Sequence, residues 1–250
     1  MSTPPQSIFW EIHSGLPREG PGDDESTRKA FLMAGELPVK ARILDIACGP
    51  GAQTMELARA GKGAITALDT HQEFLDELER RAREAQCVDR ITVINASMRK
   101  MPFEEGSFDL IWCEGAMYMM GFKEGLTAWK KFLAPHGYIA VTEPCWLKTG
   151  LTDELKAHWA EYPGMTTIEN TRQIIADAGF REIGHFVIPD SAWWTGYYTP
   201  KERRLNLLRE KYRDNTDALV QIGDAQKELD MHRKYHDFYG YVFFVMRREN

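Results

Sequence analysis

Runs of basic residues are missing from this 250-residue sequence. Its 31 Lys and Arg are outnumbered by 37 Asp and Glu, and the formal net charge is −6 at pH 7. Proteins that bind nucleic acids usually gather Lys and Arg on one surface to meet the phosphate backbone. The composition therefore disfavours a nucleic-acid partner.

Closely spaced cysteines and long apolar runs are missing too. The four cysteines, Cys48, Cys87, Cys113 and Cys145, form no C-x-x-C pair, and three lie in or beside runs that we expect to be buried strands. We interpret them as reduced core residues and expect no metal centre. No stretch of about 18 apolar residues occurs, and Met1–Gln6 is polar, unlike the start of a signal peptide. These features favour a cytoplasmic protein without a membrane anchor.

Short apolar runs alternate with amphipathic stretches through the middle of the chain, which predicts βαβ units and a parallel sheet. The runs are too short for helices, and most are rich in Ile, Val, Leu or aromatic residues, as expected of strands covered on both faces. The predicted strands are Arg42–Ala47, Ala64–Asp69, Ile91–Asn95, Phe108–Cys113, Tyr138–Glu143, His185–Ile188 and Tyr241–Met246. We therefore expect an α/β fold.

A long segment, residues 190–240, separates the last two predicted strands. Its leading aromatic residues are Trp193, Trp194, Tyr197 and Tyr198. The charged stretch Lys201–Lys234 that follows looks helical and is interpreted as a solvated helix face. An excursion of this length is interpreted as a lid or a dimerisation arm, and the second role would make the protein a homodimer. The aromatic side chains would either surround a planar or cationic ligand or close a small hydrophobic core.

The segment before the first strand has an aromatic part, Ser7–His13, and a Gly20-Pro21-Gly22 break. A helix through Ala34 follows, which Ser26 would cap. We expect the aromatic part to fold across a ligand cleft. The chain would then consist of a cap segment and helix (1–40), a main α/β domain (41–189), the insertion (190–240) and the final strand of the main sheet (241–250).

The strongest motif is an apolar strand that contains Asp45 and runs into a turn with Gly49 and Gly51. Such a turn lets the backbone approach a ligand and exposes the N–H groups of the following helix. Asp69 ends the next strand, where a carboxylate suits the two hydroxyls of an adenosine ribose. Asp45 can reach an ammonium group near the turn. A second interpretation makes Asp69 the N-cap of a helix at Phe74–Ala85.

These residues resemble motif I and the following acidic position of class I S-adenosylmethionine (SAM)-dependent methyltransferases. The resemblance covers roughly Ala41 to Glu143 and continues, in the family's order, with Ser97-Met98, Met101-Pro102-Phe103, Ser107-Phe108-Asp109-Leu110-Ile111 and Leu133-Ala134-Pro135-His136-Gly137-Tyr138. The sequence also resembles a subgroup of uncharacterised bacterial small-molecule methyltransferases, through Gly20-Pro21-Gly22, Trp112-Cys113-Glu114-Gly115-Ala116 and the aromatic insertion.

The resemblance implies a Rossmann-like, doubly wound sheet of about seven strands, the last of them antiparallel. It implies SAM as cofactor, S-adenosylhomocysteine as product and an unidentified small-molecule acceptor. Asp69 would hold the ribose, Ser97 and Met98 would contact adenine, and Gly115 would face the methionine moiety. The full expected cofactor site is Asp45, Ala47, Gly49, Gly51, Asp69, Thr70, Ser97, Met98, Glu114 and Gly115. Two residues depart from the family pattern, because Ala47 replaces its first glycine and Ser97 replaces a frequent acidic residue.

Catalysis would depend on groups near the carboxyl end of the fourth strand. Glu114 is the first candidate for orienting the acceptor or removing its proton, followed by Tyr118 and His13. Glu143 also falls at the end of a predicted strand, where open α/β sheets place their ligand crevice.

Two other function classes stay open at this point. Ala47-x-Gly49-x-x-Ala52 is also a degenerate dinucleotide fingerprint, which would make the protein an NAD(P)-dependent oxidoreductase with Asp69 on the ribose. That interpretation puts alanine at both outer glycine positions and leaves Asp45 unexplained. The third class is a non-catalytic protein of the same fold that binds a ligand through its aromatic insertion.

Overall fold

A computed structural model describes residues 5–35 and 37–249 of the chain. The first four residues of the polar start at Met1–Gln6 lie outside the described residues. So do residue 36 of the cap segment and residue 250 of the final strand.

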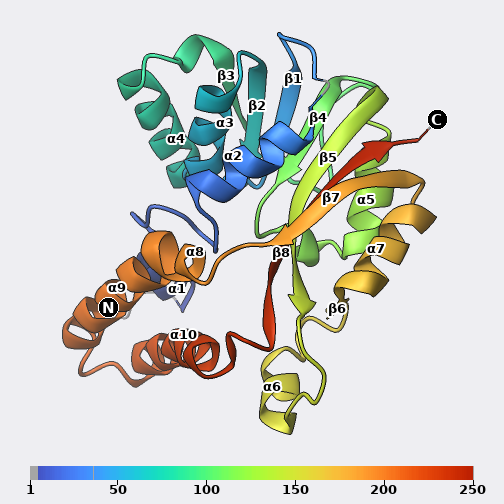
Figure 1. Cartoon of the computed structure of the whole chain (residues 1–250). Coiled ribbons are helices and arrows are strands. Elements are labelled where there is room, and N and C mark those ends of the chain that lie inside the picture. The colour runs from blue at the N-terminus through green and yellow to red at the C-terminus, as the bar shows by residue number, and fades with distance from the viewer. Residues whose placement is uncertain (1–4, 36, 250) are drawn as a thin grey trace.

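An eight-stranded sheet forms the centre of the molecule (Figure 1). Its strands follow the order β3-β2-β1-β4-β5-β8-β7, and β6 pairs with β5 beside this path. The strands are β1 (Arg42–Ile46), β2 (Ala64–Asp69), β3 (Ile91–Asn95), β4 (Phe108–Cys113), β5 (Leu133–Trp146), β6 (Thr166–Thr167), β7 (Phe180–Val187) and β8 (Tyr239–Arg248). Strands β1 to β5 pair in parallel, whereas β8 runs antiparallel to both of its neighbours. The predicted doubly wound sheet with an antiparallel last strand is confirmed.

Helices cover both faces of the sheet, which explains the continuous apolar strands. Along β1, Ile43 belongs to one hydrophobic core, whereas Leu44 and Ile46 belong to the other. Successive side chains of a strand point to opposite faces, so a strand covered on both sides is apolar throughout. Helices α2 (Asp24–Met33), α3 (Ala52–Ala60) and α4 (Gln72–Glu84) lie on one side, and α5 (Phe122–Lys130) and α7 (Ile168–Asp177) on the other (Figure 1).

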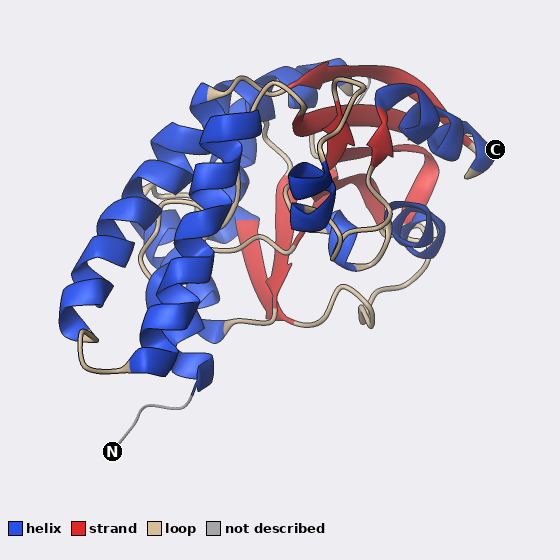
Figure 2. Cartoon of the chain, turned by 90° about the horizontal axis from the view of Figure 1, so that it is seen from below, coloured by secondary structure: helices blue, strands red, loops and turns tan. Residues whose placement is uncertain are grey.

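The N-terminal segment and the insertion before β8 contribute helices to one group beyond the carboxyl ends of the parallel strands (Figures 1 and 2). The group consists of α1 (Pro5–His13), α8 (Ser191–Trp193), the π-helix η3 (Trp194–Tyr198), α9 (Thr199–Lys211) and α10 (Thr216–Tyr235). A small core of Ile8, Ile12, Leu205, Leu208, Ala218 and Ile222 joins α1 to α9 and α10. The shorter elements are α6 (Asp153–His158), η1 (Val88–Arg90) and η2 (Met117–Met119). The predicted helical character of Lys201–Lys234 is confirmed.

Aromatic residues of the insertion form a core. Trp193, Tyr197 and Tyr198 are each 5% exposed or less, and the Trp193 ring stacks on His232 at 4.1 Å. Of the two alternatives, the structure shows the hydrophobic core, but these residues join a main core of the sheet instead of forming a small separate one. Lys201 is buried as well and binds Glu228 at 2.7 Å, so the interpretation of the whole charged stretch as a solvated face is wrong at this residue.

Several predicted boundaries are wrong. Strand β7 begins at Phe180 rather than His185, and β8 runs from Tyr239 to Arg248. Three other differences have identifiable reasons. Asp23, not Ser26, caps α2, because Asp23 is extended and its carboxylate accepts the Ser26 N–H. Strand β1 ends at Ile46, since Ala47 turns into the left-handed region. Strand β5 continues to Trp146 because β8 pairs with it residue by residue from Tyr138 onward.

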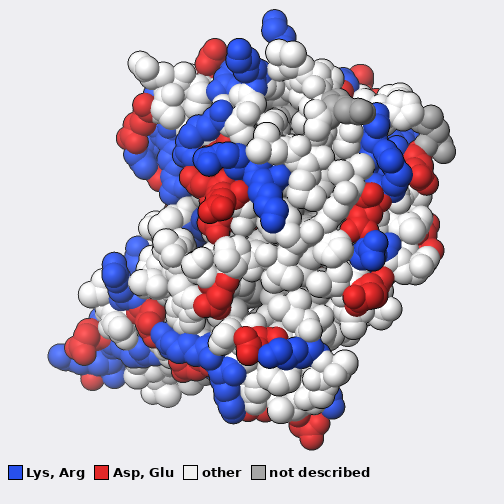
Figure 3. Space-filling view, viewed as in Figure 1, with Lys and Arg blue, Asp and Glu red and all other residues white. Residues whose placement is uncertain are grey.

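Charges of both signs lie side by side on the face seen in Figure 3, around a mostly uncharged middle. In the described ranges 5–35 and 37–249, no helix is both long enough and apolar enough to cross a membrane.

The turn after β1 yields a stability prediction. Gly51 has φ +85°, and a Cβ built on it would overlap the Leu78 side chain. Gly106 has a similar φ of +71° but no neighbour within 4 Å of such a Cβ. We expect Gly106→Ala to cost about 1 kcal/mol for the left-handed backbone alone, and Gly51→Ala to cost about 1–3 kcal/mol more for overpacking. Urea unfolding of both variants measures the difference, and equal losses would contradict the predicted overlap.

Candidate active site

The turn between β1 and α3 has an unusual backbone. Ala47, Gly49 and Gly51 have φ of +55°, +52° and +85°. Glycine adopts this region freely, whereas a Cβ there is strained. Ala47 occupies the position at which the resemblance expected glycine, so the chain keeps the left-handed geometry with an alanine in place.

Asp69 binds this turn from the end of β2. Its Oδ2 accepts the Gly49 N–H at 3.0 Å, and its Oδ1 accepts the His71 N–H at 2.9 Å. The N-cap of α4 is His71, so the interpretation of Asp69 as that N-cap is wrong. Thr70 follows as an exposed residue.

Asp45 is a fully buried carboxyl beneath the turn. It accepts hydrogen bonds from Thr54 Oγ1 at 2.5 Å and from Gln53 Nε2 at 3.4 Å. Burial raises the pKa of Asp45 from its ordinary 3.8 to about 7, and the charges of Glu114 and Asp69 add to the rise. A cation beside this carboxyl would reverse that effect.

The N-terminal segment lies over the turn. A Cβ built on Gly49 would be 3.5 Å from Glu19 Cγ, and Glu19 Oε2 lies 2.6 Å from His13 Nδ1. Burial raises the pKa of Glu19. The Trp10 ring stacks on the His71 ring with 3.6 Å between centroids. Sequence reasoning missed Glu19 and His71 as site residues, although Glu19 directly precedes the Gly20-Pro21-Gly22 break.

Glu114 is enclosed by donors at the end of β4. Its Oε1 accepts from Thr27 Oγ1 at 2.7 Å and from Trp112 Nε1 at 2.9 Å, and its Oε2 pairs with Arg18 at 3.0 Å. Both partners of this ion pair are buried. The carboxylate therefore ties the N-terminal loop to the sheet.

Three other predicted contacts lie around the same edge. Gly115, with φ +70°, donates its N–H to Thr142 Oγ1 at 2.7 Å. Ser97 and Met98 follow β3 and are half-buried. The preceding Ala96 donates its N–H to the Asp69 carbonyl at 3.0 Å, which holds this loop next to the end of β2.

Tyr118 follows Glu114 in the sequence and belongs to a second group of residues, with Tyr162 and Glu143. It lies on η2, is 38% exposed, and its ring meets the Tyr162 ring edge-on at 5.4 Å. The Tyr162 hydroxyl in turn donates to Glu143 Oε1. No sequence signal distinguished Tyr162, because it lies in an irregular segment between α6 and β6.

Buried polar atoms without a hydrogen-bond partner occur both near the glycine turn and near Tyr162. Among the described residues, four buried side-chain atoms lack a hydrogen-bond partner: Glu19 Oε1, His71 Nε2, Glu143 Oε2 and Trp159 Nε1. Buried polar groups are nearly always bonded in folded proteins, so exceptions call for an explanation such as a bound ligand. Glu19 lies against Gly49 and Glu143 binds Tyr162, whereas the Trp159 ring packs on Trp146 and Tyr239.

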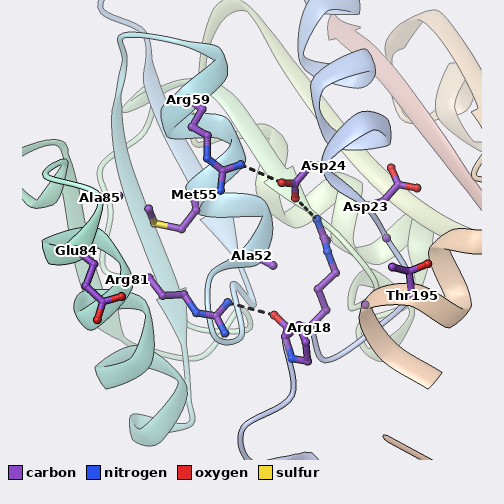
Figure 4. Close-up of a pocket in the computed structure, with 13 residues that line it drawn as sticks. Arg18, Asp23, Asp24, Ala52, Met55, Arg59, Arg81, Glu84, Ala85 and Thr195 are labelled. Carbon is purple, nitrogen blue, oxygen red and sulfur yellow. Dashed lines mark hydrogen bonds and ion pairs between the residues drawn. The ribbon is translucent and has the colours of Figure 1, made fainter. Parts of the chain in front are cut away.

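A cavity of about 660 Å³ lies beside the turn, between α3, α4, the N-terminal loop and η3 (Figure 4). Arg18, Arg59 and Arg81 point toward it, and each is already bonded, to Asp24 or to the Pro17 carbonyl. Neither Asp45 nor Asp69 lines this cavity, so we do not assign it to the cofactor.

The comparisons with known proteins agree on one family. The family model described as "Methyltransferase domain" matches residues 43–137, from β1 into β5. A relative, 27-O-demethylrifamycin SV methyltransferase of Amycolatopsis mediterranei, is 26% identical over 252 residues, which cover 96% of this chain and 88% of that protein.

Two solved structures share the fold. A SAM-dependent methyltransferase from Thiobacillus denitrificans, in complex with S-adenosylhomocysteine, has a TM-score of 0.84 with 19% identity, and the match covers 100% of both chains. The corresponding enzyme from Geobacter sulfurreducens has a TM-score of 0.83 with 19% identity over 97% of this chain and 98% of that one. The matched domain includes the turn after β1, which favours a methyltransferase over a dinucleotide oxidoreductase. Residues 43–137 thus match a methyltransferase domain, and the fold is that of SAM-dependent methyltransferases.

Proposed function

We propose that this enzyme transfers the methyl group of SAM to a small-molecule acceptor. The observation that carries the proposal is the left-handed turn after β1, to which Asp69 is bonded and beside which Asp45 is buried. Two of the similar structures are complexes with S-adenosylhomocysteine, and the rifamycin relative is named for a small-molecule acceptor. SAM would supply a methyl carbon to which the acceptor's lone pair bonds, while the carbon–sulfur bond breaks and its electrons return to sulfur.

The residues around the turn fit the parts of SAM. Asp69 would accept the two ribose hydroxyls, and Gly49 with Gly51 allows the backbone to come close. The buried Asp45 would meet the ammonium group. Toward adenine lie Thr70, Ser97 and Met98, and toward the methionine chain lie Ala47, Glu114 and Gly115.

Glu19 and His71 extend this site beyond the residues that the sequence predicted. The free Glu19 Oε1 suits a hydroxyl or ammonium donor of the cofactor, and the free His71 Nε2 suits a polar atom of it. The nearest carboxylate oxygen to His71 Nε2, on Glu73, is 3.8 Å away. His13 contacts Glu19, so we propose that His13 positions Glu19 on the cofactor side.

The cap segment (1–40) and the insertion (190–240) would act together as a lid on the main domain (41–189) and its final strand (241–250). Helix α1 contacts both α9 and α10. Lys211 and Tyr212 each bind the Glu11 carboxylate, at 2.6 and 2.7 Å. These contacts favour a lid over a dimerisation arm, because they join the insertion to its own chain.

Glu114 would position the lid rather than take a proton, because Arg18, Thr27 and Trp112 occupy its oxygens. Tyr118 would orient the acceptor as a hydrogen-bond donor. Burial and the charges of Glu228 and Glu143 raise the pKa of its phenol, which keeps the hydroxyl protonated.

Calorimetry with S-adenosylhomocysteine tests the cofactor site. Asp69→Ala should weaken binding by a few kcal/mol, because it removes charge-assisted hydrogen bonds. Asp89→Ala, at an exposed residue of η1, should leave the affinity unchanged. A folded protein that does not bind at millimolar concentration would refute the proposed function, and equal affinities of the two variants would remove Asp69 from the site. Incubation with methyl-labelled SAM and a metabolite extract would then identify the labelled product.

Asp45 predicts a pH dependence of the same binding. Without ligand its pKa is about 7, and an ammonium group pairs only with the ionised form. Binding therefore releases a proton below pH 7, so affinity for S-adenosylhomocysteine should rise roughly ten-fold from about pH 5.5 to 7 and then level off. Asp45→Asn should bind more weakly and without this rise. An identical pH profile in both proteins would show that Asp45 does not meet the ammonium.

The Arg18–Glu114 pair yields a stability prediction. Arg18→Met leaves the buried Glu114 without its cation and should cost about 3–5 kcal/mol of unfolding free energy. Adding Glu114→Gln should recover part of that loss. The control is Arg42→Met, because Arg42 is half-exposed in its pair with Asp109, which should limit the cost to about 1 kcal/mol. Urea unfolding measures all three variants, and similar losses for the Arg18 and Arg42 variants would show that the buried Arg18–Glu114 pair has no special role in stability.

A further inference from the structure

Glu143 is a buried carboxyl with one free oxygen. It lies near the carboxyl end of β5, opposite Val242 of β8, and is 3% exposed. Tyr162 donates to its Oε1, whereas its Oε2 has no partner in the described part of the chain. Removing an oxygen of this kind from water without a partner costs free energy. The free oxygen therefore indicates a partner that arrives with a ligand.

Among the described residues, no cation pairs with Glu143, so its negative charge is unbalanced when it ionises. Burial raises the pKa of Glu143 well above its ordinary value. Burial also raises the pKa of the Tyr241 phenol, and the Glu143 and Glu228 charges raise it further. The buried cation in this part of the insertion, Lys201, is already paired with Glu228. A positively charged ligand would relieve this imbalance, whereas a neutral hydroxyl would not.

Aromatic rings accompany the carboxyl. Tyr162, which binds Glu143, meets Tyr118 edge-on at 5.4 Å. Aromatic faces attract cations, and a carboxylate among aromatic rings is a common way to hold an amine.

We propose that Glu143 is the acceptor-binding residue and that the acceptor is an amine, whose nitrogen binds the free Oε2 beside Tyr118 and Tyr162. This inference rests on the proposed methyl transfer and adds its substrate class. The family model ends at residue 137, so Glu143 and Tyr162 lie outside the part of the chain that it matches.

The same contact prepares the nitrogen for reaction. An ammonium group that binds ionised Glu143 can pass one N–H proton to Oε2, which leaves a neutral amine with a free lone pair and a neutral carboxyl. Because burial disfavours the ionised carboxyl, it strengthens Glu143 as the acceptor of that proton. After methyl transfer the positive charge is on the nitrogen, again beside this carboxyl.

Benzylamine and benzyl alcohol test the inference, since they have nearly the same shape and only the amine is cationic at neutral pH. NMR titrations would use protein saturated with S-adenosylhomocysteine. The wild type should bind the amine about ten-fold more tightly than the alcohol, and Glu143→Gln should lose this preference. Equal affinities in the wild type, no amine binding at tens of millimolar, or a preference that survives Glu143→Gln would each overturn the inference.

Glu56→Gln is the matched control. Glu56 is also buried, but Arg28 and Arg59 pair with it. Its replacement should lower the unfolding free energy and keep the preference for the amine. Glu143→Gln should show the opposite pattern, because it removes a buried acid without a counter-charge.

The labelled-methyl experiment adds an independent result. A product labelled on nitrogen supports the inference, and one labelled on oxygen overturns it while the proposed methyl transfer stands. Failure of S-adenosylhomocysteine to bind would instead refute the proposed function itself.

Discussion

The hydrogen bond from the Gly49 N–H to Asp69 Oδ2 joins the turn after β1 to the end of β2. It forms because the backbone is left-handed at Ala47, Gly49 and Gly51, which brings the turn close to the neighbouring strand. The N-terminal segment then closes over the same turn through Glu19. The sheet, the turn and the N-terminal cap segment thus meet at one short stretch of backbone. Asp69, which we propose binds the ribose, also holds this turn in place.

The buried carboxyl groups are of two kinds, which differ in their bonding partners. One kind stabilises the fold, and we propose that the other binds ligands. Glu114 has Arg18 and two further donors, and it connects the cap to β4. Asp45 has only neutral donors, whereas Glu19 and Glu143 each keep an oxygen without a hydrogen-bond partner. Burial of a carboxylate without a counter-charge is unfavourable. Such groups are expected where a charged ligand completes the pairing.

The main sheet could be predicted because its strands carry strong local patterns. The predicted and observed bounds agree for Ala64–Asp69, Ile91–Asn95 and Phe108–Cys113, since buried parallel strands read as short apolar runs. Other bounds failed for one long-range reason and one local reason. Strand β5 extends to Trp146 because β8 pairs with it, and a helix start depends on which nearby side chain reaches the free N–H groups, here Asp23.

The sequence by itself determined where the main polar residues of the proposed cofactor site lie along the chain. Asp45 is within the first strand, a glycine turn follows, and Asp69 ends the second strand. Those features are local, since they depend on spacing along one strand–turn–helix unit. Only the tertiary structure decided that Glu19 lies against Gly49 and that Tyr162 binds Glu143. Glu19 is 30 residues from its neighbour and Tyr162 is 19 residues from its partner, so no local periodicity couples them. The packing of the cap and the insertion beyond the strand ends brings such residues together, because separate segments there share one buried volume.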